Sequence, residues 1–390
     1  MLLFSLLAFV GVVRAENVAK IGDVEYETLQ EAVNAVQEGE TITLLADVEL
    51  AEMVTFPAAK TATLDLNGKS ISMEESIIST AYALQNLGNL TLKDGVGTGS
   101  ISARGIYNGY GEGAENVATA KIIVESGVIN AKGTNGGAAI YNYGVVEVKG
   151  GKFESNGGYG LNNQSGASMT ITGGEIRGGI YNCGTLSVDG ENTSVYQHLS
   201  GKHAIYNWSA TATINNGAFD SESGNELILA DGENCSVTIN GGTFDKTAKS
   251  WLMGAATGKN ITFVINGGTF RGYVNQPEMT VDTFRPYGDP IVVYGGNFNF
   301  NPTQWLSDDY TVKANDGNYT VERKPDVAKI GDVGYTSLAK AVAAIQDGET
   351  ITLVANEKFT ENNRYNNGGY WDGLGYAGDK NFTIDLNGYT

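Results

Sequence analysis

The sequence predicts an all-β chain wound into a solenoid, in which short strands from successive coils stack on one another. One pattern, an alternating strand followed by a glycine turn and an apolar residue, occurs eight times between residues 120 and 298, mostly at intervals of 20–28 residues. Such periodicity is typical of solenoids, because each unit covers the apolar face of the next. The composition agrees: 53 glycines are too many for a helical protein, and 41% hydrophobic residues are too many for a disordered one.

The repeat alternates apolar and polar residues, and a period of two predicts strands with one buried face. Clear copies are MTITGGEI (169–176), VTINGGTF (237–244) and FVINGGTF (263–270). Three apolar columns result when the copies are aligned on the turn. They comprise Val124, Val148, Ile171, Val188, Ile214, Ile239, Ile265 and Val293; then Ile122, Val146, Met169, Leu186, Ala212, Val237, Phe263 and Ile291; and, after the turn, Ile129, Phe153, Ile176, Phe219, Phe244, Phe270 and Phe298. The glycines predict a sharp bend that needs positive φ or close backbone approach.

A second row of motifs, of the form IYN, interleaves with the first. Its aliphatic residues are Leu84, Ile106, Ile140, Leu161, Ile180 and Ile205, and its asparagines are Asn86, Asn108, Asn142, Asn163, Asn182 and Asn207. We therefore expect two strand rows in each coil, with coils stacked about 4.8 Å apart like neighbouring strands of a sheet. Asparagines at matching corners are expected to form a hydrogen-bonded ladder.

Together the two rows resemble the right-handed parallel β-helix of the pectin-lyase-like superfamily. More narrowly, the IYN and TITGG motifs are similar to those of surface proteins and adhesins of Gram-positive, often gut-dwelling, bacteria. The resemblance covers nearly the whole chain after residue 15. It implies a right-handed parallel β-helix with an N-terminal cap, exported to the surface of a Gram-positive bacterium.

The chain also contains an internal duplication. Residues 18–45 recur at 327–354 with 19 of 28 positions identical, and TLDLNGKSI at 63–71 is answered by TIDLNGYT at 383–390. The sequence therefore predicts a second module that starts near residue 326.

Each copy of the duplicated segment predicts a short amphipathic helix. In the first copy, Thr28 and Glu31 have the spacing of a capping box, and Gly39 ends the helix. The second copy keeps Ser337 as the N-cap but has Lys340 where the box requires an acid. We expect the first helix to seal the open end of the solenoid core, because solenoid ends need protection from edge pairing.

The predicted domain organisation follows from these signals. An apolar run ending in Val-Arg-Ala is too short to span a bilayer and predicts a cleaved signal peptide. The predicted parts are a signal peptide at 1–15, a β-helix module at 16–325 (helical cap about 26–39, coils about 40–298, closing segment 299–325), and the truncated start of a second module at 326–390. The sequence thus indicates a fragment of a longer, multi-module protein.

Charge and cysteine content limit the partners. A net charge of −19 argues against nucleic acid and anionic membranes, and fits solubility in a secreted protein. Without a calcium-loop motif, no metal or other cofactor is predicted. Cys183 and Cys235 occupy different columns of the repeat, so both a disulfide and two free thiols remain open.

The resemblance also raises the possibility of a polysaccharide lyase or glycoside hydrolase. A lyase needs calcium-binding acids with an Arg or Lys, and a polygalacturonase-like hydrolase needs paired Asp residues. The outward columns of the aligned repeats carry Thr, Asn, Glu, Lys and Ser instead. The adjacent pair Asp308–Asp309 lies in the closing segment, His198 and His203 flank LSGK, and Arg285 lies in a loop. No catalytic residue is predicted.

The strongest candidate for a binding site is aromatic. In the IYN row, the residue beside the buried aliphatic is expected to face outward, and a second aromatic follows two positions later. These candidates are Tyr107, Tyr141, Tyr143, Tyr181, Tyr206 and Trp208. Aromatic rows flanked by Asn and Ser suit sugars, whose C–H faces stack on rings. The alternative is that the tyrosines stack on one another and bind nothing.

These observations lead to one interpretation and two alternatives. We interpret the chain as a non-catalytic, secreted or cell-surface repeat protein that recognises an extracellular glycan or a host surface ligand. The alternatives are a polysaccharide-cleaving enzyme and a structural stalk of a larger surface protein.

Overall fold

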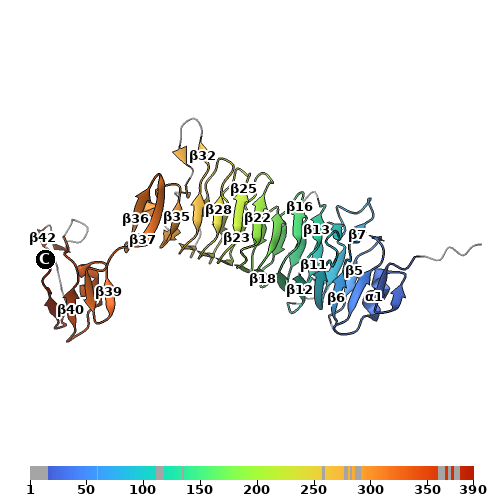
Figure 1. Ribbon diagram of the computed structural model, residues 1–390, viewed down its shortest axis with the longest axis horizontal. Helices are drawn as coiled ribbons and strands as arrows, with labels where there is room; N and C mark the ends of the chain where they lie inside the picture. Colours follow the sequence, from blue (N-terminus) through green and yellow to red (C-terminus); the bar gives the residue numbers. More distant parts are fainter. Residues whose placement is uncertain are drawn as a thin grey trace, which may run out of the picture. The chain divides into compact units, whose positions relative to one another are not determined.

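The computed structural model describes residues 16–58, 60–110, 118–133, 136–256, 260–275, 280–281, 283–285, 291–358, 365–367, 370–372 and 378–390. The predicted signal peptide at 1–15 lies outside the described residues. The chain forms two compact units: residues 1–305 with 314–320, and residues 306–313 with 321–390. The first unit is a parallel β-solenoid, so the predicted fold class is confirmed (Figure 1).

Sheet 1 contains the strands of the TITGG-type motifs. In spatial order it runs β2 (Val24–Tyr26), β1 (Ala19–Ile21), β3 (Thr41–Leu44), β6 (Thr61–Asp65), β9 (Asn89–Lys93), β12 (Lys121–Val124), β15 (Val145–Val148), β18 (Ser168–Ile171), β21 (Thr185–Val188), β24 (Thr211–Ile214), β27 (Ser236–Ile239), β30 (Thr262–Ile265) and β34 (Ile291–Val293). From β3 onward neighbouring strands pair in parallel, whereas β1 pairs antiparallel with both β2 and β3.

Sheet 2 contains the strands that follow the glycine turns. Its order is β4 (Val48–Leu50), β7 (Ser70–Met73), β10 (Ser100–Ala103), β13 (Val128–Ala131), β16 (Lys152–Ser155), β19 (Gly174–Arg177), β22 (Thr193–Gln197), β25 (Ala218–Ser221), β28 (Thr243–Asp245), β31 (Thr269–Arg271), β35 (Gly296–Phe298), β37 (Asn318–Arg323) and β36 (Tyr310–Asn315). The division between the two units runs through β36 and β37.

Sheet 3 contains the strands of the IYN row. Its order is β5 (Val54–Phe56), β8 (Leu84–Asn86), β11 (Ile106–Asn108), β14 (Ile140–Asn142), β17 (Leu161–Asn163), β20 (Ile180–Asn182), β23 (Ile205–Trp208), β26 (Ile228–Asp231) and β29 (Met253–Ala255). Each full coil therefore contributes one strand to each of three sheets, and the expectation of two strand rows was wrong. The apolar residue after each glycine turn belongs to a strand of its own. In β16, β19 and β28 it is the only large apolar residue of the strand, so the sequence alone shows no apolar alternation there.

The three apolar columns form the core of the solenoid. Val148 pairs in register with Val124 on one side and with Ile171 on the other, as the aligned repeats predict. Phe153 pairs with Ile129 and Ile176 in the same way. All six side chains are at most 3% exposed. The predicted columns are confirmed.

Phenylalanines extend the third column into a stack of parallel rings. Phe219, Phe244, Phe270 and Phe298 lie 4.8–4.9 Å apart between ring centroids, with planes within 8° of parallel. Phe284 is fully buried at the end of this stack and packs edge-on against Phe270 and Phe298. Among the described residues the last strand of sheet 3 is β29, whereas sheet 1 continues with β30 and β34 and sheet 2 with β31 and β35. The backbone of Thr283 and Arg285 bonds to Leu252 and Met253 there. Phe284 thus fills core space beyond the last strand of sheet 3.

The glycine pairs serve two different purposes at each turn. A Cβ on Gly241 would lie 2.4 Å from the carbonyl oxygen of Asn215 in the preceding coil, so the first glycine permits close approach. Gly242 has φ +102°, a conformation that other residues rarely adopt, so the second glycine permits the bend. Both predicted reasons for glycine are confirmed.

The predicted asparagine ladder is confirmed. Each amide Nδ2 donates to the Oδ1 of the next asparagine at 2.6–2.8 Å, and every member has zero exposure. The ladder runs Asn86, Asn108, Asn142, Asn163, Asn182, Asn207. At its end Asn207 donates to the sulfur of the buried Cys235 at 3.1 Å. Cys183 and Cys235 are both free thiols, which answers the question left open by the sequence.

Helix α1 (Leu29–Ala35) has the predicted capping box, since Thr28 and Glu31 exchange side-chain to backbone hydrogen bonds. It is shorter than the span of 26–39 expected for it, because only seven residues have helical geometry. The helix buries Leu29, Ala32 and Val33. Its role in sealing the core stays a prediction. No helix among the described residues has both the length and the apolar character needed to cross a bilayer.

The second unit repeats the start of the first. It contains β38 (Ala328–Ile330), β39 (Val333–Tyr335), α2 (Leu338–Ala344), β40 (Thr350–Leu353) and β43 (Thr383–Asp385), with β41 (Tyr365–Asn367) and β42 (Tyr370–Asp372) as a separate antiparallel pair. Elsewhere in the chain are the 3₁₀ turn η1 (Thr303–Trp305) and the short pair β32 (Val274–Asn275) and β33 (Thr280–Val281).

The duplication extends to individual hydrogen bonds. Asn67 in the first unit has φ +48° and donates to the carbonyl of Leu44 at 2.9 Å. Asn387 in the second unit has φ +47° and donates to the carbonyl of Leu353 at 3.1 Å. The two DLNG motifs therefore form the same turn, and Ser337 caps α2 as predicted.

Candidate functional site

The six predicted aromatic residues lie on one side of the solenoid. Tyr107 pairs in register with Tyr141, and Tyr181 with Tyr206, on strands whose flanking residues point into the core. All four tyrosines are partly exposed, and so is Tyr143 just after β14. Trp208 at the end of β23 is 42% exposed. We call this surface, made by Tyr107, Tyr141, Tyr143, Tyr181, Tyr206 and Trp208, the aromatic face.

The rings at the N-terminal part of the aromatic face touch one another. Tyr107 lies 3.8 Å from Tyr82 and 4.5 Å from Tyr110 between ring centroids, and Tyr110 lies 5.1 Å from Tyr143. Tyr141 lies 5.9 Å from Tyr107 and donates its hydroxyl to a backbone carbonyl of a nearby loop. In this group the tyrosine rings therefore pack on one another, as in the alternative to sugar binding that the sequence left open.

A second group of rings follows two coils later. Tyr181 lies 5.5 Å from Tyr159 and 5.4 Å from Tyr206, and Trp208 meets Tyr206 edge-on at 5.9 Å. Between the two groups, Asn162 takes the outward position in the register of Tyr141 and Tyr181. The face therefore alternates aromatic surface with an amide along the solenoid axis.

Burial of the phenols changes their acidity. Partial burial is the largest cause that raises the pKa of Tyr141 and of Tyr181 to about 12, and it also raises the pKa of Tyr107 and Tyr206. At neutral pH these side chains are uncharged hydroxyls that can donate and accept hydrogen bonds. An uncharged, hydroxyl-bearing aromatic surface suits a polyol ligand better than an ionic one.

This shift predicts an alkaline loss of stability. The unfolded phenols ionise near pH 10, whereas those of Tyr141 and Tyr181 in the folded chain ionise near pH 12. The unfolded state therefore loses protons first, and the stability present below pH 10 should fall as the pH rises towards about 12. Phenolate absorbance and denaturation midpoints across this range would measure it, with Tyr181→Phe reducing the slope. Simultaneous titration of all tyrosines near pH 10 would contradict the prediction.

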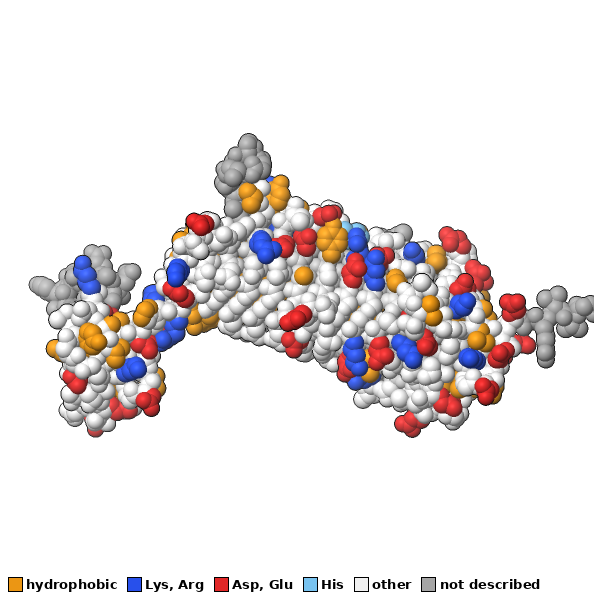
Figure 2. All heavy atoms as spheres, in the orientation of Figure 1, with side chains coloured by type: hydrophobic (Ala, Val, Ile, Leu, Met, Phe, Trp, Pro, Cys, Tyr) orange, Lys and Arg blue, Asp and Glu red, His pale blue; other side chains and the backbone are white. Residues whose placement is uncertain are grey.

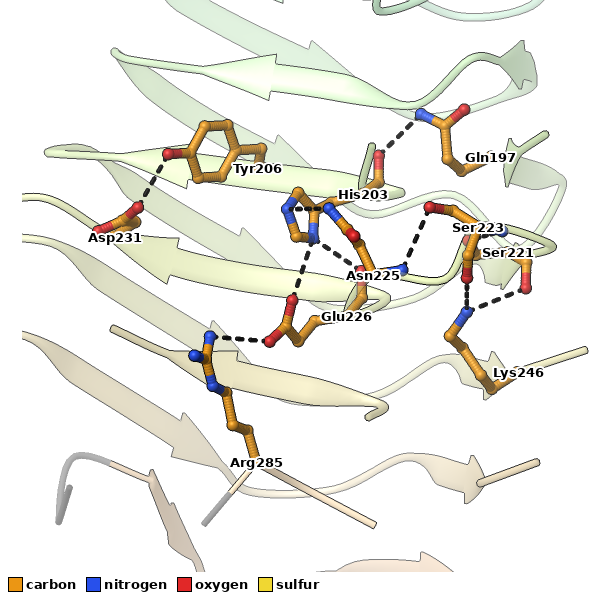
Figure 3. Close-up of polar contacts among 10 residues, drawn as sticks. All are labelled: Gln197, His203, Tyr206, Ser221, Ser223, Asn225, Glu226, Asp231, Lys246 and Arg285. Atoms are coloured by element: carbon orange, nitrogen blue, oxygen red, sulfur yellow. Dashed lines mark hydrogen bonds and ion pairs between the residues drawn. The ribbon is translucent and has the colours of Figure 1, made fainter. Parts of the chain in front are cut away.

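A buried polar cluster adjoins the second aromatic group (Figure 3). The ring of His203 stacks on that of Tyr206 at 5.2 Å, and its Nδ1 lies 2.8 Å from the carbonyl oxygen of Glu226. Glu226 accepts a hydrogen bond from Arg285 at 2.9 Å, and the Arg285 guanidinium lies over the ring of Trp251. His203 and Glu226 are each 6% exposed. Burial lowers the pKa of His203, so the ring is neutral at pH 7.

Hydrogen-bond geometry assigns the His203 tautomer. Because Nδ1 faces a carbonyl oxygen, it carries the proton and donates, and Nε2 faces the amide nitrogen of Asn225 at 3.4 Å as an acceptor. On the far side of Tyr206, its hydroxyl donates to Asp231 at 2.8 Å. Tyr206 is thus held by its neighbours on both sides, which fixes the orientation of one ring of the aromatic face.

Sequence reasoning treated His203 and Arg285 separately and did not single out Glu226. Both ring nitrogens of His203 have hydrogen-bond partners. The three side chains come from loops before β23, β26 and β34, outside the repeated columns. No sequence signal marks Glu226, because the equivalent positions of the preceding coils carry residues as different as Tyr159, Gly178 and His203.

The outer face of sheet 2 carries charged side chains of both signs (Figure 2), and Tyr196 lies among them in register with Arg177. Arg177 and Glu154 pair in register, as do Asp245 and Arg271, the latter 2.9 Å apart. Burial, and the nearby Asp245, raise the pKa of Asp220. The outward columns taken from the aligned repeats did not include this one, because the strands of sheet 2 had not been recognised as a separate row.

A shallow depression lies on this charged face. It has a volume of about 390 Å³, and its lining includes Glu175, Arg177, Asp220 and Asp245. Asp309, from the pair noted in the sequence, is instead bonded to Lys340 and Thr336 in the second unit. In the part of the chain that the structure describes, no three or more His, Cys, Asp or Glu side chains are arranged to hold a metal ion.

No protein-family model, curated protein or solved structure matches this chain. The aromatic face presents partly exposed rings, neutral hydroxyls and an amide at the strand spacing of sheet 3.

Proposed function

We propose that the first unit is a non-catalytic recognition module of an exported surface protein, and that its aromatic face binds an extended glycan. The observation that supports this is the partial exposure of aromatic side chains in register on one outer face of sheet 3. Sugar rings present C–H faces that pack on aromatic rings, while their hydroxyls need amide and carboxylate partners. Asn162 and Asp231 supply such partners beside the rings.

A repeated face also supports the proposal through multivalency. Two aromatic groups lie on either side of Asn162, so a chain of several sugars can contact both at once. Weak contacts along one rigid scaffold add up, because the second contact is intramolecular once the first has formed. The same reasoning fits a repetitive glycan better than a single small ligand.

The test begins with a glycan array and continues with titration of the best soluble oligosaccharide. Trp208→Ala should weaken binding about tenfold, because loss of a stacked aromatic contact costs on the order of 1.4 kcal/mol. The matched control is Tyr294→Ala, which removes an exposed aromatic (37%) that follows strand β34 of sheet 1. We expect this control to bind like the parent chain.

Three outcomes would decide against the proposal. Absence of binding to any glycan would favour the structural-stalk alternative. Equal binding by the Trp208→Ala and parent chains would move the site away from the aromatic face. Release of reducing or unsaturated sugars, lost on Asp220→Asn, would favour a polysaccharide-cleaving enzyme that acts in the depression on sheet 2.

A further inference from the structure

The three sheets end in different ways at the N-terminal end of the solenoid. Sheet 1 is closed there by β1, which pairs antiparallel with β3. Sheet 3 ends at β5, where the side chain of Gln30 in α1 both accepts from the backbone N–H of Thr55 at 2.9 Å and donates to its carbonyl at 3.3 Å. Gln30 thus occupies the positions that another strand would take. Sheet 2 ends at β4 with no further strand among the described residues.

The free edge of β4 has its backbone groups turned outward. The carbonyl of Leu50 accepts from the N–H of Glu74, so Leu50 faces the neighbouring strand β7. Successive residues of a strand turn their N–H and C=O groups to opposite sides. The N–H and C=O of Glu49 therefore point away from β7, towards the open edge, where an added strand would find a donor and an acceptor.

A groove of about 330 Å³ lies along this edge. Its walls are the start of α1 and the segment from β4 to β5, and its lining includes the apolar residues Val18, Leu29 and Met53. Leu29 is 1% exposed, whereas Val18 and Met53 are partly exposed. The groove thus combines an open strand edge with apolar surface, which is what an extended peptide needs in order to bind by strand addition.

The charge of the groove selects the kind of peptide. Its lining contains four acids, Glu27, Asp47, Glu49 and Glu52, and neither lysine nor arginine. All four are exposed. A second copy of this chain, with net charge −19, would bring like charges together at such an edge. A cationic strand would instead bring opposite charges together at this edge.

Sheet 2 itself shows which residue fits opposite Glu49. On its outer face, Asp245 lies in register with Arg271 on the next strand, and the two side chains are 2.9 Å apart. Arg177 and Glu154 are in register in the same way. A strand added to β4 would place one outward side chain directly beside Glu49, and an arginine or lysine there would form the same cross-strand pair.

We propose that the groove beside β4 binds an extended peptide segment in which basic residues alternate with apolar ones, by adding it as a further strand of sheet 2. The apolar residues of the peptide would cover Val18 and Met53, and its basic residues would face Glu49 and the other acids. Acidic residues at a free edge also discourage aggregation. Such protection needs no partner, whereas binding by strand addition requires a peptide of matching charge.

The test uses a fluorescent peptide, Val-Arg-Val-Arg-Val-Arg, titrated into the full chain. Glu49→Pro removes the outward N–H without touching the bonds to β7, and proline is tolerated at such edge positions. Glu49→Ala removes the charge but keeps the N–H. Glu49→Pro should weaken binding about tenfold or more and Glu49→Ala only a few-fold, and higher salt should weaken binding by the parent chain.

Two peptide controls keep the test independent of folding in the variants. A peptide with glutamate in place of arginine should not bind, and one with proline in place of the central valine should bind at least about tenfold more weakly. The proposal is overturned if no basic peptide binds, if both peptide controls bind like the parent peptide, or if the two Glu49 variants bind equally. Peptide-independent self-association lost in Glu49→Pro would instead identify a second copy as the occupant and would also overturn it.

Discussion

Replacing Phe244 by alanine is expected to destabilise the solenoid by about 4 kcal/mol, because truncation of a buried phenylalanine removes its transfer free energy and leaves a cavity. Phe244 has zero exposure and lies between two parallel rings, 4.9 Å from Phe219 and 4.9 Å from Phe270. Collapse around the cavity is restricted, since hydrogen bonds to the adjacent coils hold β28 in place on both sides. The lost volume should therefore remain largely unfilled.

The appropriate control is Phe244→Leu, which keeps most of the apolar volume and should cost about 1.5 kcal/mol or less. Denaturant midpoints measure both, and hydrogen exchange in β25 and β31 reports whether the loss is local. Exchange is needed because stability in a solenoid is a sum of repeat and interface terms, so unfolding need not be two-state. A loss below about 1 kcal/mol for alanine would contradict the cavity argument.

The second large effect is expected at Asn142, in the middle of the buried ladder. Its Oδ1 accepts from Asn108 and from the N–H of Gly144, and its Nδ2 donates to Asn163 and to the carbonyl of Ser168. Alanine at this position leaves several buried groups without a partner, at about 1–3 kcal/mol for each group that stays unsatisfied. We expect a total loss of about 3 kcal/mol.

The chain contains a matched control in a second, exposed asparagine row. Asn240 donates to Asn215 and accepts from Asn266, each at 2.8 Å, so its side-chain chemistry resembles that of the ladder. Water can replace these partners, and Asn240→Ala should therefore change stability by no more than about 0.5 kcal/mol. Equal losses for Asn142→Ala and Asn240→Ala in the same denaturation assay would show that burial does not matter here.

A further variant separates shape from hydrogen bonding at the ladder. Asn142→Asp keeps the size of the side chain but cannot donate to Asn163 when ionised. It also buries a charge, so at neutral pH its loss should be at least as large as that of alanine. Protonation at low pH restores one donor, and the deficit relative to the parent chain should then shrink.

The repeated parts of the fold could be predicted because register carries them from coil to coil. Once parallel pairing places Val148 beside Val124 and Ile171, every equivalent residue must stack, so the aliphatic columns follow directly from the alignment. The same register placed the asparagines within hydrogen-bond distance. The capping box of Thr28 and Glu31 was also predictable, since it depends on a spacing of three residues.

The count of sheets could not be predicted in the same way. Several strands of sheet 2 contain only one large apolar residue, so a residue such as Phe153 was visible as a column but not as part of a strand. Recognising that row would also have revealed the column that contains Arg177 and Asp245. The charged face was therefore missed together with the sheet that carries it.

The candidate site likewise has one part that could be predicted from the sequence and one part that could not. The outward tyrosines were predictable, because the neighbour of a buried strand residue faces the other side. The cluster of His203, Glu226 and Arg285 was not, since Arg285 lies 59 residues from Glu226 and both belong to loops outside the repeat. Periodicity, a local property of the chain, determined the columns, the ladder and the aromatic face. Contacts between non-repeating loops, and the open edge at β4, were decided only by the tertiary structure, because no register relates those residues to one another.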